Sequence, residues 1–227
     1  MKIIAVDQGT TGTKGHIYDE TGRFEQRASF EHRQIYPHSG WVEHDGEELL
    51  AHVQACLDAT PDADAIGLAN QGETVLAWDA QTGVPVHHAI VWQDQRTQGL
   101  TATLKAQGHE VLTLARAGLP LDPYFSASKM RWFIDHVDEA KRLLKLGRLR
   151  LGTSDAFFMD RLCGVFATDV STASRTSLMR LDSCTWDADL CELFGIPMQC
   201  LPRIQATTGV FGTVQGRPLT ASVVDQQ

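Results

Sequence analysis

The sequence contains no long hydrophobic run. Its N-terminal apolar stretch, Ile3–Val6, is only four residues long, whereas a membrane-spanning helix needs about 20 consecutive apolar residues. A secretory signal peptide also needs a longer apolar segment than this one. We therefore expect no membrane partner and a cytoplasmic location.

Cysteine and positive charge are also scarce. The five cysteines show no C-x-x-C spacing, which argues against a disulfide framework or a zinc site and fits a reducing compartment. Lysine and arginine together number 20 against 28 aspartates and glutamates, which gives a formal net charge of −8. This balance argues against nucleic acid as the main partner. It does not exclude ATP, because a phosphate site needs only local donors.

Strands and helices alternate along the chain after an initial series of strands. Residue patterns predict strands over 3–6, 14–19, 23–32, 65–70, 75–78, 88–92, 149–152 and 220–224. They predict helices after an Asp45/Glu48 capping box and over 97–107, 126–137, 156–162 (capped by Ser154-Asp155) and 188–193, and a loop or edge segment over 168–179. This order predicts an α/β fold with a mixed sheet that starts as an antiparallel β-meander.

The first predicted strand leads into a carboxylate and a Thr/Gly-rich turn. Asp7 follows the strand, and Thr10, Thr11 and Gly12 lie in the turn. Turn N–H groups and threonine hydroxyls can converge on phosphate oxygens, and a carboxylate beside phosphates suits Mg²⁺. The pattern resembles the first phosphate loop of the actin-like ATPase fold, although the residues alone also fit an ordinary hairpin.

Further polar and aromatic residues suggest a polyol site. Gln71 and Glu73 follow the strand over 65–70, at the end where open α/β sheets bind their ligands. Each polyol hydroxyl needs an acceptor and a donor, which Glu73 and Tyr124 can supply, while Trp92 offers an apolar wall. On spacing alone, Glu73 also fits a solvated loop, Trp92 a core position and Asp225 a polar tail.

Seven segments together resemble the FGGY family of carbohydrate kinases, and within it the glycerol kinases. These segments are 7–15, 41–45, 67–74, 90–97, 118–126, 168–176 and 223–227, and the resemblance covers residues 2–227. It implies an actin-like ATPase (ribonuclease H-like) domain with a mixed five-stranded sheet, an antiparallel β-meander and flanking helices. It also implies that residues 1–227 form a single N-terminal, substrate-side domain, with the C-terminal nucleotide-binding domain absent from this sequence.

The resemblance also implies an enzyme that uses ATP and Mg²⁺ to phosphorylate a polyol or sugar hydroxyl. It gives Asp225 the role of the catalytic base that accepts the proton of the attacking hydroxyl. It implies polyol contacts from Gln71, Gly72, Glu73, Trp92, Tyr124, Asp225 and Gln226, phosphate or nucleotide contacts from Thr10, Thr11, Gly12 and Lys14, and a metal contact from Asp7. Asp169 and Arg175 are expected to hold loops beside the site, through an Asp–Arg pair or side-chain caps.

The sequence departs from the family pattern at two of these positions. Gly72 and Lys14 each stand where glycerol kinases carry an arginine. Lysine keeps the charge of arginine but loses its bidentate fork, and glycine removes both charge and volume. We therefore expect a larger or wetter pocket at Gly72. Glycerol is the favoured substrate, with another polyol or a pentulose (erythritol- or xylulose-type) as the alternative.

The length of the chain limits these expectations. Members of this family are roughly twice as long, with two domains in keeping with ordinary domain sizes. We therefore expect little kinase activity from this chain by itself. The alternative from a different functional class is an actin-like module that binds a nucleotide or sugar without catalysis. The sequence also leaves open whether the chain forms a homo-oligomer.

Overall fold

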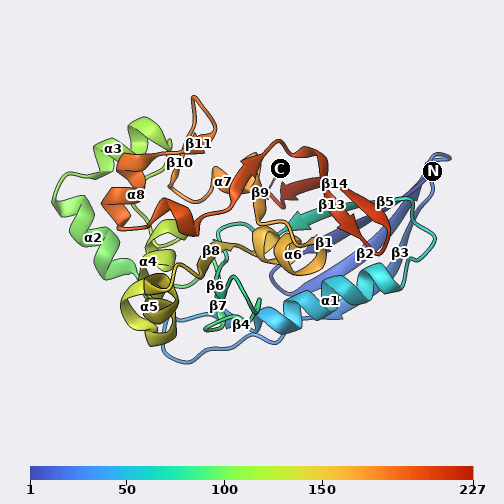
Figure 1. The fold of residues 1–227 in the computed structure, drawn as a ribbon, viewed down its shortest axis with the longest axis horizontal. Helices are drawn as coiled ribbons and strands as arrows, with labels where there is room; N and C mark the ends of the chain where they lie inside the picture. The colour runs from blue at the N-terminus through green and yellow to red at the C-terminus, as the bar shows by residue number, and fades with distance from the viewer. Residues whose placement is uncertain (227) are drawn as a thin grey trace.

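A mixed sheet forms one end of the molecule. The computed structural model describes residues 1–226. In it, six strands lie in the order β13-β14-β5-β1-β2-β3 (Figure 1). These strands are β1 (Lys2–Gln8), β2 (Gly12–Asp19), β3 (Phe24–Glu31), β5 (Ala65–Asn70), β13 (Thr208–Val214) and β14 (Arg217–Val224). Strands β1 and β14 both run parallel to β5 between them, while β2, β3 and β13 continue the sheet in antiparallel pairings.

This sheet confirms the predicted α/β class and the initial meander, but the expected strand count of five was wrong. The additional strand, β13, has mostly exposed side chains and therefore lacks the apolar alternation that marks a half-buried strand. Only its pairing with β14 makes it part of the sheet.

One face of the sheet is covered by two helices, α1 (Gly46–Asp58) and α6 (Ser154–Cys163). Along β1 the buried Ile4 and Val6 alternate with the exposed Ala5 and Asp7, so that only one face joins the core. Helix α1 begins after Asp45, whose side chain accepts hydrogen bonds from the next turn as predicted. The Glu48 carboxylate instead accepts from Arg33 N, so only half of the expected capping box is present. Helix α6 begins at Ser154 itself and has no side-chain cap.

A second sheet and five helices form the other end of the molecule, on the left in Figure 1. The sheet has the order β4-β7-β6-β8 and comprises β4 (Glu43–His44), β7 (Ala89–Ile90), β6 (Val75–Asp79) and β8 (Leu149–Thr153). The helices are α2 (Gln98–Ala106), α3 (Glu110–Arg116), α4 (Ser126–His136), α5 (Asp138–Lys145) and α8 (Ala188–Phe194). A second apolar core lies between these elements, including Phe133, Leu143 and Leu151.

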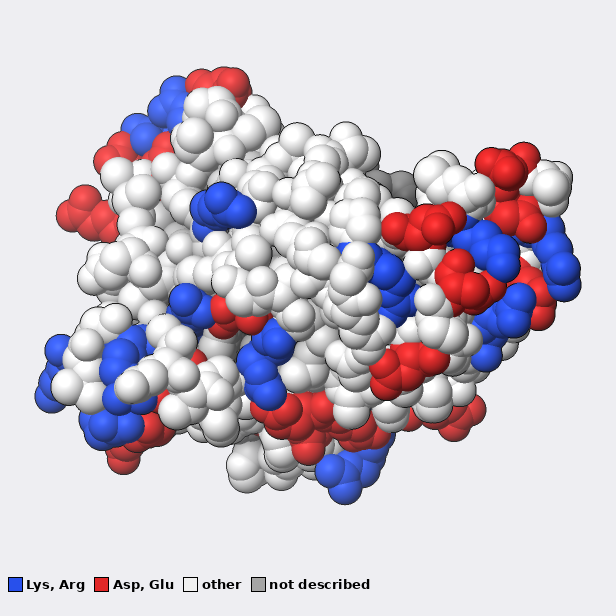
Figure 2. All heavy atoms as spheres, turned by 45° about the vertical axis from the view of Figure 1, so that its right-hand side comes forward, with Lys and Arg blue, Asp and Glu red and all other residues white. Residues whose placement is uncertain are grey.

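The remaining elements are short. They are β9 (Ala167–Asp169), α7 (Val170–Ala173), β10 (Met179–Arg180), β11 (Thr185–Trp186), the 3-10 helix η1 (Met198–Cys200) and β12 (Arg203–Gln205). The predicted loop or edge segment over 168–179 begins with the end of β9, which belongs to a two-stranded sheet with β12, and it also contains the short helix α7, which was not predicted. Among residues 1–226, no helix combines the length and apolarity needed to cross a membrane. Acidic and basic side chains are intermixed on the surface drawn in Figure 2.

Candidate functional site

The carboxyl ends of three parallel strands meet at one edge of the six-stranded sheet. Because β5 lies between β1 and β14, the residues that follow each strand come together there. Gln71 N donates to Gln8 O at 2.7 Å, and Asp225 N donates to Asn70 O at 2.9 Å. This arrangement brings three separate predicted motifs to the edge where ligands of open α/β sheets bind.

Five of the predicted polyol residues lie in one group, which is held together by hydrogen bonds and by the peptide bonds Gly72–Glu73 and Asp225–Gln226. Gly72 N donates to Asp225 Oδ1 at 3.3 Å. The Gln226 amide donates to Glu73 Oε2 at 3.2 Å and to the Tyr124 hydroxyl at 2.9 Å. Residues far apart in the sequence thus place acceptors, donors and an aromatic face at one position, as recognition of a polyol requires.

Trp92 connects this group to the hairpin between β1 and β2. Its ring packs edge-on against Tyr124 with 5.6 Å between centroids, and its indole Nε1 donates to Thr10 Oγ1 at 2.9 Å. Gln71 does not join the group, because its fully buried side chain contacts His44 Nδ1 at 3.2 Å instead.

The environment of Gly72 differs from the sequence expectation. A Cβ atom at this position would lie 2.7 Å from Val224 Cγ2 and 3.2 Å from Gln226 Oε1. Directly beside the Gly72 backbone the expected larger or wetter space is therefore not present, because the Val224 and Gln226 side chains lie there. Glycine at this position allows β14 and Gln226 to approach.

Arg175 is a site residue that sequence reasoning assigned only to loop support. Its Nε donates to Glu73 Oε1 at 2.7 Å, and the Glu73 side chain is 0% exposed. Asp169 instead caps α7 by accepting from Ser171 N and Thr172 N, so the cap was expected correctly but the Asp–Arg pair was wrong. A buried carboxylate requires a cation or hydrogen-bond donors, but only the fold could identify Arg175 as that cation.

Burial and charge raise the pKa values of the acidic groups in this site. Burial raises the pKa of Glu73, although Arg175 opposes that shift. Partial desolvation raises the pKa of Asp225, opposed by the Gly72 N–H, and the nearby Asp7 carboxylate raises it further. A carboxylate with a raised pKa is a better proton acceptor, which suits Asp225 for general-base chemistry.

The hairpin between β1 and β2 is held by its own carbonyl groups. Thr10 O accepts from Gln34 Nε2, Thr11 O from His32 N and Gly12 O from Gly9 N, at 2.8 to 3.0 Å. Gly12 is also required by packing, since a Cβ there would lie 2.6 Å from Phe30 O.

Lys14 and Asp7 lie directly opposite one another on β2 and β1. Lys14, Thr11 and Gly12 line a hollow of about 470 Å³ beside the hairpin. Glu31 and other residues of β3 line the same hollow, so a phosphate there would meet the Lys14 cation and the Thr11 hydroxyl but also a carboxylate.

The carboxylates near the hairpin could supply some, but not all, of the ligands of a Mg²⁺ ion. Asp7 and Asp225 supply hard oxygen donors at the ends of β1 and β14, which both flank β5. Within residues 1–226, no group of three or more His, Cys, Asp or Glu side chains is arranged to hold a metal ion. Mg²⁺ would therefore depend mainly on phosphate and water oxygens, as it commonly does.

Three histidines lie beneath the hairpin, a cluster that the sequence pattern did not reveal. His32 Nε2 is 3.0 Å from Thr13 Oγ1, and His32 Nδ1 is 3.0 Å from His52 Nδ1. The His32 and His44 rings lie 5.8 Å apart. Burial lowers the pKa of His32 to about 4, assisted by the charge of His52. Burial likewise lowers the pKa of His44 to about 4, with a smaller contribution from His32.

These two lowered pKa values predict acid lability. Below pH 6.5 the unfolded chain binds protons that the folded rings reject, so stability is full above 6.5 and falls as pH drops toward 4. When the pH is lowered from 7 to 5, we expect the free energy of unfolding to fall by on the order of 2 kcal/mol for each of the two rings. Urea unfolding at both pH values measures this. His44→Gln should reduce the pH dependence, whereas His109→Gln, at an exposed site, should leave it unchanged. An equal pH dependence in all three proteins would contradict the prediction.

Comparison with known proteins identifies the family of the chain. The model of the family described as "FGGY family of carbohydrate kinases, N-terminal domain" matches residues 2–224. The glycerol kinase of Ectopseudomonas mendocina is 43% identical over 97% of this chain and 47% of its own length. That of Koribacter versatilis is 44% identical over 94% of this chain and 45% of its own. The chain thus spans about half the length of the curated relatives it matches.

Solved structures give the same result for the fold. The structure of Plasmodium falciparum glycerol kinase with ADP has a TM-score of 0.94 and 31% identity, over 99% of this chain and 48% of that one. Gluconate kinase from Lactobacillus acidophilus has a TM-score of 0.89 at 22% identity, over 99% of this chain and 48% of that one, a likeness of fold alone.

Proposed function

The chain belongs to the FGGY family of carbohydrate kinases, and from this premise we propose that it provides the polyol-binding half of an ATP-dependent glycerol kinase. Residues 1–227 would then correspond to the substrate-side domain, and most of the nucleotide pocket would lie in the part of the relatives that this chain does not match. The observation that carries the proposal is the Glu73–Gln226–Tyr124 group beside Asp225. We further propose a cytoplasmic location, since the cysteines found in residues 1–226 are all free.

In this proposal each residue has a defined part in the reaction. Glu73 and the amide of Gln226 hold two hydroxyls of the polyol, and the Trp92 and Tyr124 rings cover its carbon chain. Asp225 Oδ accepts the proton of the hydroxyl that attacks. When bound, ATP supplies the phosphoryl group and Mg²⁺ neutralises phosphate charge. Phosphoryl transfer depends mostly on placement and charge neutralisation, so Thr10, Thr11 and Lys14 would act by holding phosphate oxygens.

A coupled assay of glycerol phosphorylation tests the function. We expect little turnover from the 227-residue polypeptide alone and measurable turnover when it is combined with the C-terminal half of a glycerol kinase. Calorimetric titration with glycerol, without ATP, separates a kinase half from a polypeptide that binds no polyol. A chain that binds glycerol but never supports turnover in any combination would favour the alternative of a sugar-binding module without catalysis.

The close packing at Gly72 yields a prediction about substrate affinity. Gly72→Ala would place a methyl group 2.7 Å from Val224 Cγ2 and 3.2 Å from Gln226 Oε1, so the side chains on both sides of Asp225 would have to shift. We expect glycerol binding to weaken about tenfold, since overpacking typically costs 1 to 3 kcal/mol. The measurement is calorimetry with glycerol, erythritol and xylulose.

Gly99→Ala is the matched control for this substitution. Apart from its chain neighbours and the backbone of its own helix, no atom lies within 4 Å of a Cβ at Gly99 in helix α2, and alanine favours helices, so affinity should not change. Unchanged glycerol affinity in Gly72→Ala would contradict the prediction. Stronger binding of erythritol or xylulose than of glycerol by the unsubstituted chain would overturn glycerol as the substrate.

A further inference from the structure

Lys129 is a fully buried lysine that the proposed mechanism does not use. It lies on α4, with 0% of its surface exposed. Its Nζ donates to the backbone carbonyls of Pro123, at 3.0 Å, and of Tyr124, at 2.6 Å. A buried ammonium group is costly unless its N–H donors are paired. Its pairing with two consecutive carbonyls therefore suggests a role for this loop beyond packing.

These carbonyls belong to the loop that carries Tyr124 into the site. Within the loop, Tyr124 N donates to Asp122 Oδ1 at 2.8 Å, and Phe125 N to Asp122 O at 3.3 Å. The same Tyr124 places its hydroxyl 2.9 Å from Gln226 Nε2. Its ring lies 5.6 Å from that of Trp92. Lys129 thus binds the backbone of Tyr124, whose side chain contacts both Gln226 and Trp92.

We propose that Lys129 is a positioning residue for polyol binding, which holds the Pro123–Tyr124 backbone so that the Tyr124 hydroxyl meets Gln226 beside Glu73. The polyol part of this inference rests on the function proposed above. An ammonium group suits the task because it offers three donors from one atom. An apolar side chain of similar length would leave both carbonyls unpaired in the interior.

The electrostatic surroundings of Lys129 agree with this role. Burial lowers the pKa of Lys129 to about 7. The carboxylates of Glu73, Asp94 and Asp122 oppose this shift, and Arg96 adds to it. Reciprocally, the charge of Lys129 lowers the pKa of Glu73. Lys129 is therefore coupled to the site through the field at Glu73 as well as through the loop.

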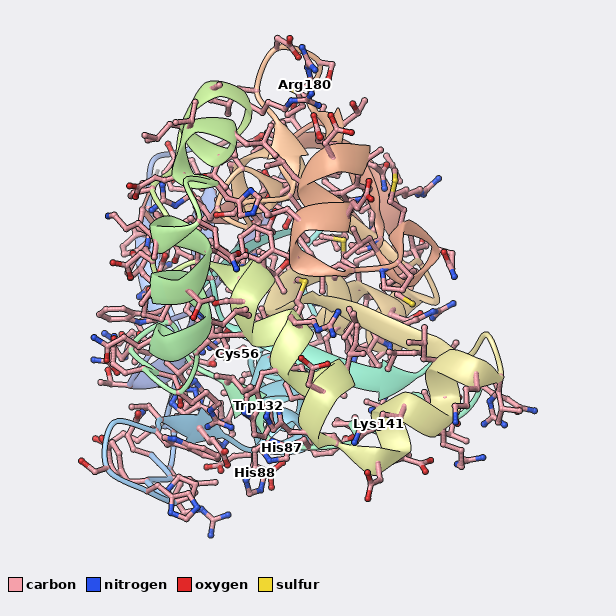
Figure 3. The ribbon with its side chains drawn as sticks, turned by 90° about the vertical axis from the view of Figure 1, so that its left-hand side faces the viewer. Cys56, His87, His88, Trp132, Lys141 and Arg180 are labelled. Atoms are coloured by element: carbon pink, nitrogen blue, oxygen red, sulfur yellow. The ribbon has the colours of Figure 1, made fainter. Side chains whose placement is uncertain are left out.

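Hydrogen exchange of the ligand-free chain tests the positioning directly. In Lys129→Met, the backbone amides of Tyr124 and Phe125 should exchange about tenfold faster, because the loop loses its anchor. The matched control is Lys141→Met on α5, an exposed lysine that pairs with Asp138 (Figure 3), and it should exchange like the unsubstituted chain. Unchanged exchange over 118–125, or an increase spread over α4, β6 and β8, would overturn the proposal.

Glycerol binding tests whether the positioning serves the site. By calorimetry we expect Lys129→Met to weaken glycerol binding about tenfold, and to have a smaller effect when Tyr124→Phe is already present. Equal effects of Lys129→Met in both backgrounds, or unchanged affinity, would overturn the role in binding. If the unsubstituted chain binds no polyol, the proposed function fails. Hydrogen exchange then still decides whether Lys129 positions Tyr124.

Discussion

Replacing Asp225 with asparagine is expected to lower kcat for glycerol phosphorylation about 10³-fold. Asparagine keeps the shape of the side chain, and its Oδ1 can still accept from Gly72 N, now 3.3 Å away. It cannot accept a proton from the attacking hydroxyl. Because the loss falls on the chemical step rather than on binding, KM for glycerol should change little. The assay is steady-state kinetics of the chain combined with the C-terminal half of a glycerol kinase.

The pH profile provides a second reading of the same substitution. The pKa of Asp225 is raised by partial desolvation and by Asp7, so activity should fall as pH drops through that pKa and the base becomes protonated. The residual activity of Asp225→Asn should lack this acid limb. Asp182→Asn is the control, because Asp182 is an exposed partner of Arg180 at the far end of the molecule (Figure 3). More than a tenth of the original kcat in Asp225→Asn would rule out a general-base role.

Replacing Arg175 with methionine is expected to destabilise the fold and to abolish measurable glycerol binding. The substitution leaves Glu73, which is 0% exposed, without its cation. Removing one partner of a buried ion pair typically costs about 3 kcal/mol or more. The free energy of unfolding in urea and calorimetry with glycerol measure the two effects.

The direction of the pH dependence distinguishes this mechanism from simple loss of packing. Burial already raises the pKa of Glu73, and Arg175 limits that rise. Without Arg175 the pKa rises further, so Glu73 accepts a proton more readily as pH falls. Arg175→Met should therefore be less destabilised at pH 5 than at pH 8. The double variant Glu73→Gln/Arg175→Met should recover most of the lost stability. Equal destabilisation at both pH values would instead indicate lost packing.

Local sequence patterns predicted the elements that carry strong periodicity. The strand over 65–70 coincides with β5, the strand over 3–6 lies within β1, and that over 220–224 lies within β14. Each has β-favouring or small apolar residues that must be buried on at least one face. The helix after Asp45 was predictable because a capping carboxylate precedes an apolar stripe.

Elements with weak periodicity could not be predicted in this way. Strand β13 is mostly exposed, so its presence depends on the hydrogen bonds offered by β14. Helix α7 has only four residues and depends on the cap from Asp169. In both, the stabilising partner lies outside the segment, so the pattern of the segment alone carries little information.

The sequence by itself determined the α/β class, the order of the motifs and the identity of the residues at the ends of the strands. These features depend on side-chain chemistry and on neighbours within a few positions. Only the tertiary structure decided that Arg175 pairs with Glu73, that Val224 and Gln226 close the space at Gly72, and that Lys129 holds the Tyr124 loop. Most of these contacts join residues far apart in the sequence, and all of them depend on close packing. Their geometry is set by how strands and helices pack, which no local pattern encodes.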